Sequence, residues 1–165
     1  MTTTPLLLIT ADPSQPLAHL ALRYARAYLN RASGAVTADD ATEDDTTETG
    51  DKAASNSDAD NRNNPNIKPP ALNIFFYSDA AHIANRLRWQ SADQTDLTKG
   101  WQTLAEQYQL SLPVCVSTAL SRGISDADNS TRHQLDGDNL AAGFTLVGLS
   151  ELALMIEDSC RLMQF

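Results

Sequence analysis

The feature that most constrains the fold is an alternation of short apolar runs with helical patterns along the chain. Residues 5–10 and 72–77 are nearly continuous apolar runs, which are typical of strands buried on both faces of a sheet. Apolar residues at helical spacing follow the second run: Leu97, Trp101, Leu104 and Tyr108. Strands that alternate with helices predict an α/β fold with three layers, in which helices cover both faces of a mainly parallel five-stranded sheet.

The other expected elements complete this pattern. Three further strands are predicted, at 112–115, 144–147 and 161–165. The remaining helices are predicted after Ser14, which is placed to cap the first one, over 79–88, after Cys115 and over 149–156. In open parallel sheets, sites lie beyond the carboxyl ends of the strands, so functional residues are expected there.

The segment from 34 to 69 differs from the rest of the chain in composition. It carries nine acidic and three basic residues, and therefore −6 of the net charge of −9. Its only large apolar residues are Val36 and Ile67. Such a segment cannot bury enough apolar surface to offset its ordering entropy. We therefore expect a single domain over 1–165 with a disordered acidic insertion at 34–69; an acidic docking arm is the alternative.

Composition also excludes several classes of protein. An acidic chain is a poor candidate for direct binding to nucleic acid, which needs clustered Lys and Arg. Two cysteines do not form a disulfide framework, the N-terminus lacks the basic region of a signal peptide, and no stretch could span a membrane. These observations predict a cytoplasmic protein that contacts neither nucleic acid nor membrane.

Cys115 is the candidate catalytic residue. Residues 112–123 have the pattern of a short buried strand that turns into a helix, and the thiol falls at the junction. A thiolate there is stabilised by the unpaired N–H groups and the dipole of the helix. The alternative is a structural cysteine, because free cysteines often pack as small hydrophobes.

Other candidate sites are weaker. The first predicted strand-to-helix loop, 10–16, has no glycine and two prolines, which argues against a phosphate cradle for flavin or nucleotide. His19, His82 and His133 have no partner at metal-ligand spacing. Cys160 is interpreted as a packed cysteine, with a resolving thiol as the alternative. We therefore expect no cofactor and no metal.

Several motifs together resemble the DsrE family, and the likeness points to its TusD-like sulfurtransferase branch. They cover nearly the whole chain outside the acidic insertion: residues 75–77, 84–85, 114–123, 139–140, 143–149 and 161–165. The resemblance implies the DsrE-like variant of a flavodoxin-like fold. The insertion and the glycine-free first loop depart from the family pattern, but neither touches the cysteine motif.

The resemblance also implies a function. In TusD-like proteins the motif cysteine, here Cys115, carries a persulfide from a TusA-like donor to a TusE-like acceptor, for 2-thiouridine formation at the tRNA wobble position. TusB- and TusC-like subunits complete a heterohexamer. The chemistry requires an exposed cysteine, and the polar segment 124–139 is expected to be a mobile loop that gates it. The alternatives are a subunit of dissimilatory sulfur oxidation, a non-catalytic assembly subunit, and a small-molecule binder of flavodoxin type.

Overall fold

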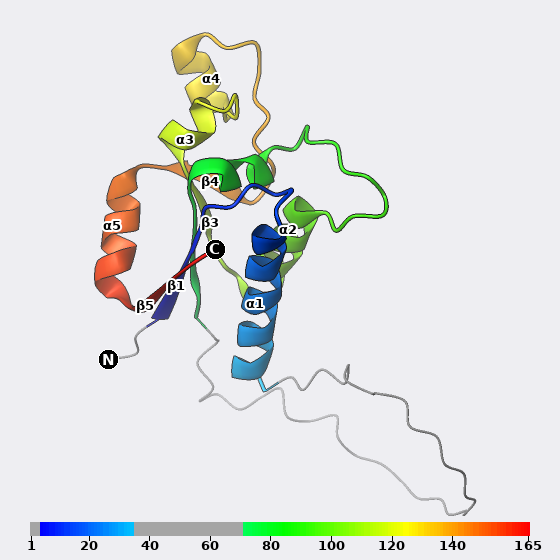
Figure 1. Ribbon diagram of the computed structural model, residues 1–165. Coiled ribbons are helices and arrows are strands. Elements are labelled where there is room, and N and C mark those ends of the chain that lie inside the picture. Colours follow the sequence, from blue (N-terminus) through cyan, green and yellow to red (C-terminus); the bar gives the residue numbers. More distant parts are fainter. Residues whose placement is uncertain (1–3, 35–70) are drawn as a thin grey trace, which may run out of the picture.

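The structure is a computed structural model that describes residues 4–34 and 71–165. Strands and helices alternate along these residues as the sequence predicts (Figure 1). In chain order the elements are β1 (Thr4–Ile9), α1 (Pro16–Ala32), β2 (Asn73–Phe76), the 3₁₀ helix η1 (Ser78–Ala84), α2 (Leu97–Tyr108), β3 (Leu112–Cys115), α3 (Val116–Leu120), α4 (Ala127–His133), β4 (Phe144–Val147), α5 (Leu149–Asp158) and β5 (Ser159–Gln164).

The strands form one sheet in the order β4-β3-β2-β1-β5, and every neighbouring pair is parallel. The prediction of a parallel five-stranded α/β sheet is therefore confirmed. The strand order differs from the flavodoxin order 2-1-3-4-5, because β5 rather than β2 flanks β1 on the outer side. The flavodoxin likeness thus holds for the layers and the parallel sheet, but not for the order of the strands.

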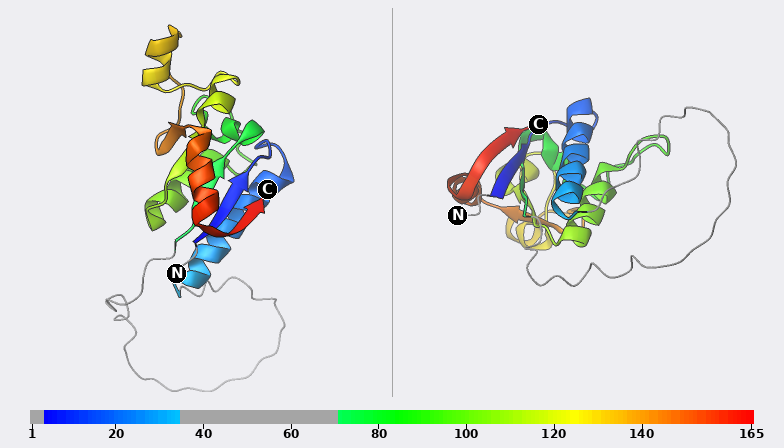
Figure 2. Two further views of the ribbon diagram at one scale, coloured as in Figure 1. Left: turned by 90° about the vertical axis from the view of Figure 1, so that its left-hand side faces the viewer. Right: turned by 90° about the horizontal axis from the view of Figure 1, so that it is seen from below.

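The two faces of the sheet are covered unequally. Helices α1 and α2 pack on one face, and α5 lies on the other (Figure 2). Because side chains alternate along a strand, Leu7, Phe76 and Val114 join the large core beneath α1 and α2. Leu6, Phe75 and Cys115 point to the α5 face, where they form a smaller cluster. No residue of α5 is fully buried, so this second layer is thin.

Local sequence signals explain where the two long helices begin. Pro16 stands at the start of α1, where its missing N–H costs no intrahelical hydrogen bond. The Asp96 side chain accepts a hydrogen bond from the Lys99 amide and caps α2. The prediction that Ser14 caps α1 is wrong: the N-cap is Gln15, and the Ser14 hydroxyl donates instead to Asp12.

The structure corrects two further elements and leaves one prediction untested. The helix expected over 79–88 is the shorter 3₁₀ helix η1, and the polar segment 124–139 contains the helix α4. The acidic insertion predicted at 34–69 lies outside the described residues except for Gly34, which follows α1. Within the described ranges, no helix combines the length and the apolar character needed to cross a membrane.

A close contact between α1 and α2 depends on Gly100. A Cβ atom added at Gly100 would lie 2.5 Å from Leu22 Cδ2, and Leu22 is only 2 % exposed. We predict that Gly100→Ala destabilises the protein by roughly 1 kcal/mol, because the strain of overpacking exceeds the gain in helix propensity. Urea unfolding measures the change, with Thr103→Ala at an exposed position of the same helix as the control. A Gly100→Ala variant as stable as the parent would contradict this packing.

Candidate functional site around Cys115

Cys115 lies at the carboxyl edge of the sheet, as the sequence predicts. It is the last residue of β3, where it pairs with Val147 of β4, and it is also the N-cap residue of α3. Helix α3 packs against η1 (Figure 1). The 3₁₀ helix η1 begins just after the neighbouring strand β2 ends, at the same edge of the sheet. The thiol is thus held where two strand-to-helix turns meet.

The Cys115 side chain is buried, which corrects the expectation of an exposed thiol. The residue has an exposed fraction of 0 %. Leu6 and Phe75 pack against it within the sheet face, and the partly buried Val147 and Leu152 complete its cover on the α5 side. A partner protein can reach the sulfur only after some of this cover moves.

Polar groups nevertheless contact the sulfur from α3. The Ser117 hydroxyl lies 3.1 Å from Cys115 Sγ, and the Thr118 hydroxyl donates to the Cys115 carbonyl oxygen at 3.1 Å. Burial, the largest single influence, raises the pKa of the thiol. The hydroxyl and amide groups of Ser117 and Thr118 together outweigh it, so the pKa of Cys115 is lowered below its usual value.

An ion pair fixes α3 against η1 beside the thiol. Arg122 Nε and Nη2 donate to Asp79 Oδ1 at 3.0 and 2.7 Å, and Arg122 Nη1 donates to the Thr118 carbonyl oxygen at 3.1 Å. Because Thr118 follows Cys115 by less than one helical turn, Arg122 links the position of the thiol to that of η1. Arg122 lies within the motif 114–123, but its contact with Asp79 could not be read from the sequence.

The segment 124–139, predicted to be a mobile loop, contains α4 and is held at its base by hydrogen bonds. The Ser130 hydroxyl, in α4, donates to the Gly137 carbonyl oxygen at 2.7 Å and lies 2.9 Å from the Ser125 hydroxyl. Asn139 accepts from the Ser125 amide and donates to the Gly123 carbonyl oxygen. The two ends of the segment are thereby joined at its base.

The other candidates from the sequence do not assemble into a site. His19, His82 and His133 lie on α1, η1 and α4, and the described part of the chain holds no group of three residues placed to bind a metal ion. In the first loop, Asp12 Oδ1 accepts from both the amide and the hydroxyl of Ser14. Both of these donors are therefore engaged by a carboxylate. The alternative role of Cys160 as a resolving thiol stays a prediction.

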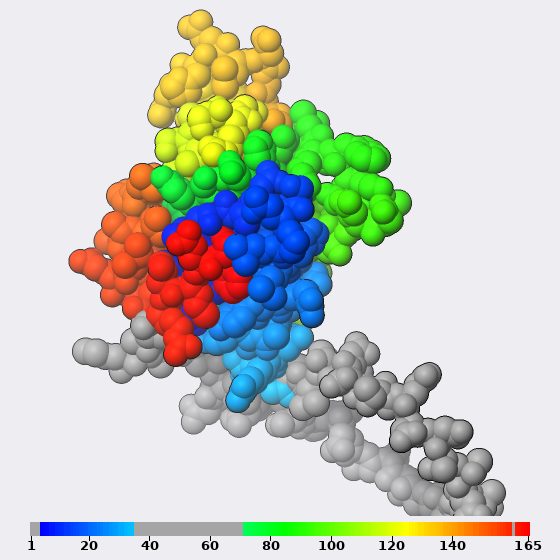
Figure 3. Space-filling model, in the orientation of Figure 1, coloured from blue at the N-terminus to red at the C-terminus, as the bar shows by residue number. Residues whose placement is uncertain are grey.

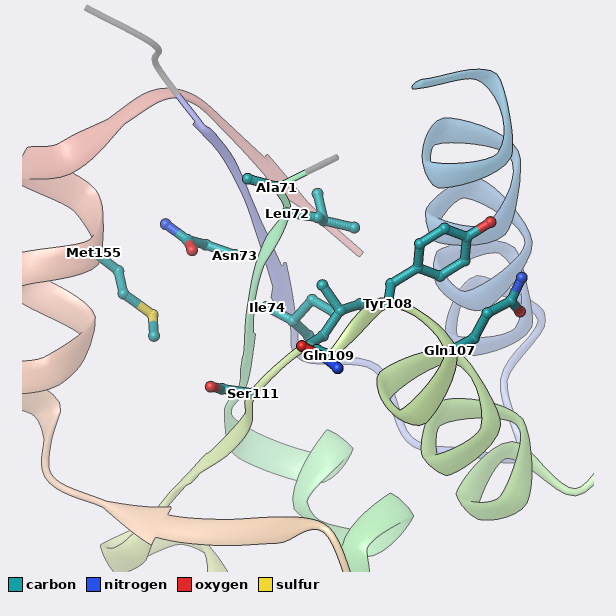
Figure 4. A pocket seen from close by; sticks show the side chains of 10 residues that line it. Ala71, Leu72, Asn73, Ile74, Gln107, Tyr108, Gln109, Ser111 and Met155 are labelled. Carbon is teal, nitrogen blue, oxygen red and sulfur yellow. The ribbon is translucent and has the colours of Figure 1, made fainter. Parts of the chain in front are cut away.

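One cavity lies at the edge of the sheet opposite Cys115. It has a volume of about 510 Å³ and is lined by residues at the amino ends of β2 and β3 and at the end of α2, with Met155 of α5 on its far side (Figure 4). Its polar groups are those of Asn73, Gln107, Tyr108, Gln109 and Ser111. They include no thiol, imidazole or carboxylate, and the cavity lies away from Cys115.

Residues 6–165 match the model of the DsrE/DsrF-like family. The chain belongs to this family. It is 44% identical over 92 residues to the sulfurtransferase TusD of Pectobacterium atrosepticum, an alignment that covers 56% of this chain and 71% of that protein. It is 40% identical over 94 residues to a sulfurtransferase TusD homolog of Vibrio parahaemolyticus, covering 57% and 72% of the two chains.

The fold has a counterpart among solved structures. The crystal structure of the ychN protein from E. coli superimposes with a TM-score of 0.64 and covers 99% of this chain and 100% of that one, at 15% sequence identity. At this identity the likeness concerns the fold alone. It supports the three-layer arrangement that places Cys115 at the carboxyl edge.

The ion pair of Arg122 and Asp79 should control access to the thiol. We predict that Arg122→Met frees α3 from η1 and speeds alkylation of Cys115 by about two- to fivefold, the effect of losing an interaction of roughly 0.5–1 kcal/mol. Peptide mass spectrometry after timed alkylation measures the rate. Arg132→Met, at an exposed position of α4, is the matched control. Equal rates in both variants would show that the ion pair does not restrain the cover.

Proposed function

We propose that this chain is a sulfurtransferase subunit that carries a persulfide on Cys115. The observation that carries the proposal is the position of the thiol: the N-cap of α3, with hydroxyl and amide groups that lower its pKa. Membership of the DsrE/DsrF-like family and the sulfurtransferase names of the relatives support it. The proposed donor is TusA-like, the acceptor TusE-like, and the end product 2-thiouridine at the tRNA wobble position.

The transfer needs only thiol chemistry. The Cys115 thiolate attacks the outer sulfur of the donor's persulfide, a new S–S bond forms, and the electron pair of the broken S–S bond leaves on the donor's cysteine. An acceptor thiolate then removes the same sulfur from Cys115 by the reverse type of attack. The rate depends on the thiolate fraction and on access to the sulfur. The lowered pKa serves the first requirement.

Burial of the thiol suits a carrier whose cargo must survive between two partners. With an exposed fraction of 0 %, the sulfur is shielded from water and from small oxidants until the cover opens. Binding of a donor or acceptor would supply the energy for this opening. Burial also favours a second candidate function, a non-catalytic assembly subunit in which Cys115 only fills the small cluster beneath α5.

Replacement of the thiol separates the two functions. We predict that Cys115→Ser abolishes the transfer of labelled sulfane sulfur from a cysteine desulfurase system to a TusE-like acceptor, because the variant retains the shape of the side chain but not its nucleophile. Cys160→Ser is the matched control and should keep most of the activity. If Cys115→Ser in the complete complex still transferred sulfur at the parent rate, the assembly role would be the correct one.

The α5 face is the proposed contact with TusB- and TusC-like subunits. Leu149, Leu154 and Ile156 of α5 are 49%, 57% and 49% exposed, and Leu162 of β5 is 45% exposed. The two elements adjoin on one side of the molecule (Figure 3). Outside these two elements, Trp89 is 83% exposed, whereas Phe144 is buried at 5%. Apolar surface of this kind favours association.

A charge on this face should prevent assembly. We predict that Leu154→Glu shifts the chain, co-expressed with TusB- and TusC-like partners, from a hetero-oligomer toward the free subunit, because a carboxylate cannot be buried without a partner. Sedimentation velocity at low micromolar concentration measures the shift. Leu20→Glu on α1, where Leu20 is 48% exposed, is the control and should assemble normally. The reverse pattern would place the interface on α1.

A further inference from the structure

We propose that Ser117 is a positioning residue of the sulfur-transfer site, whose hydroxyl donates a hydrogen bond to the Cys115 thiolate and holds it ready for attack. The inference rests on the proposed function of Cys115. It adds Ser117 to the proposed site, although the thiol–persulfide exchange itself needs only the Cys115 thiolate.

The geometry distinguishes Ser117 from the other neighbours of the sulfur. The two fully buried residues that share a cluster with Cys115, Leu6 and Phe75, are apolar. Ser117 Oγ lies 3.1 Å from Sγ, within reach of a hydrogen bond to sulfur. The Thr118 hydroxyl is instead engaged by the Cys115 carbonyl oxygen. Both hydroxyls lower the pKa of Cys115, that of Ser117 more strongly, and the Ser117 hydroxyl is the one in hydrogen-bond contact with the sulfur.

Ser117 also joins the sulfur to the solvent. Cys115 has no exposed surface, whereas Ser117, two residues further along, is exposed. A hydroxyl can accept a hydrogen bond from the thiol and, after rotation, donate one to the thiolate. The same group can thus serve both protonation states without any movement of the backbone.

Such a hydrogen bond matters more for a buried sulfur than for an exposed one. A thiolate beneath Leu6 and Phe75 has lost its hydration, so each remaining donor has a larger effect on its stability. Burial raises the pKa of Cys115, and the Ser117 hydroxyl is the leading influence that lowers it. Without the hydroxyl, the thiolate fraction at neutral pH falls and attack on the donor's persulfide slows. The bonds formed and broken in that attack are unchanged.

Titration of the thiol tests the inference apart from any sulfur transfer. The full-length chain carries Cys160→Ser throughout, so that Cys115 is the only thiol, and its thiolate absorbance is followed against pH as a difference from Cys115→Ser. We expect Ser117→Ala to raise the midpoint by about one pH unit, the effect of a hydrogen bond to a charged group. Ser117→Thr, which keeps the hydroxyl, should restore the parent midpoint.

A second serine, Ser121 at the end of α3, provides the control variant. Ser121→Ala removes a hydroxyl that donates to the Thr118 carbonyl oxygen and not to sulfur, so its midpoint should equal that of the parent. A Ser117→Ala midpoint that also equals the parent's, or a shift that Ser117→Thr fails to reverse, would overturn the role of Ser117. Persistent sulfur transfer by Cys115→Ser would instead refute the proposed function, whatever the midpoints are.

Discussion

The parallel pairing of β3 between β2 and β4 is the constraint on which the site depends. Cys115 is the last residue of β3 and pairs with Val147 of β4. There the chain must leave a buried sheet and begin a helix, so the sulfur lies beside the first turn of α3. The alternation of side chains along β3 directs Val114 to the α1 and α2 core and Cys115 to the α5 face. The thinly covered face of the sheet thus receives the Cys115 thiol, the proposed nucleophile.

Burial and reactivity are balanced at this position. The apolar cluster removes the sulfur from water and by itself disfavours the thiolate, while donors from the first turn of α3 favour it. The ion pair of Arg122 and Asp79 keeps that turn in place. An enclosed thiol with a lowered pKa suits the proposed carrier, which has to react with a donor and an acceptor and with few other molecules. Under this account, control lies in the opening of the cover rather than in the chemistry of the sulfur.

Periodicity was sufficient to predict the sheet, the helices α1, α2 and α5 and the junction at Cys115, because runs such as 72–77 and the spacing of Leu97, Trp101 and Leu104 reflect burial directly. The burial of Cys115 could not be predicted, since it depends on contacts with Leu6 and Leu152, which are remote in sequence. The same holds for the pairing of Arg122 with Asp79, 43 residues apart. The contact of Ser117 with the sulfur could have been predicted from the sequence, because a serine two residues after an N-cap cysteine lies in the first turn of the helix.

The central claim is that the relayed sulfur resides on Cys115. Its most direct test is to load the full-length chain with sulfane sulfur from a cysteine desulfurase system, alkylate it without reductant, and locate the added mass of one sulfur atom by peptide mass spectrometry. The account predicts the added sulfur on the peptide that contains Cys115 and no added sulfur on the peptide that contains Cys160. Added sulfur on Cys160 alone, with Cys115 unmodified, would contradict it.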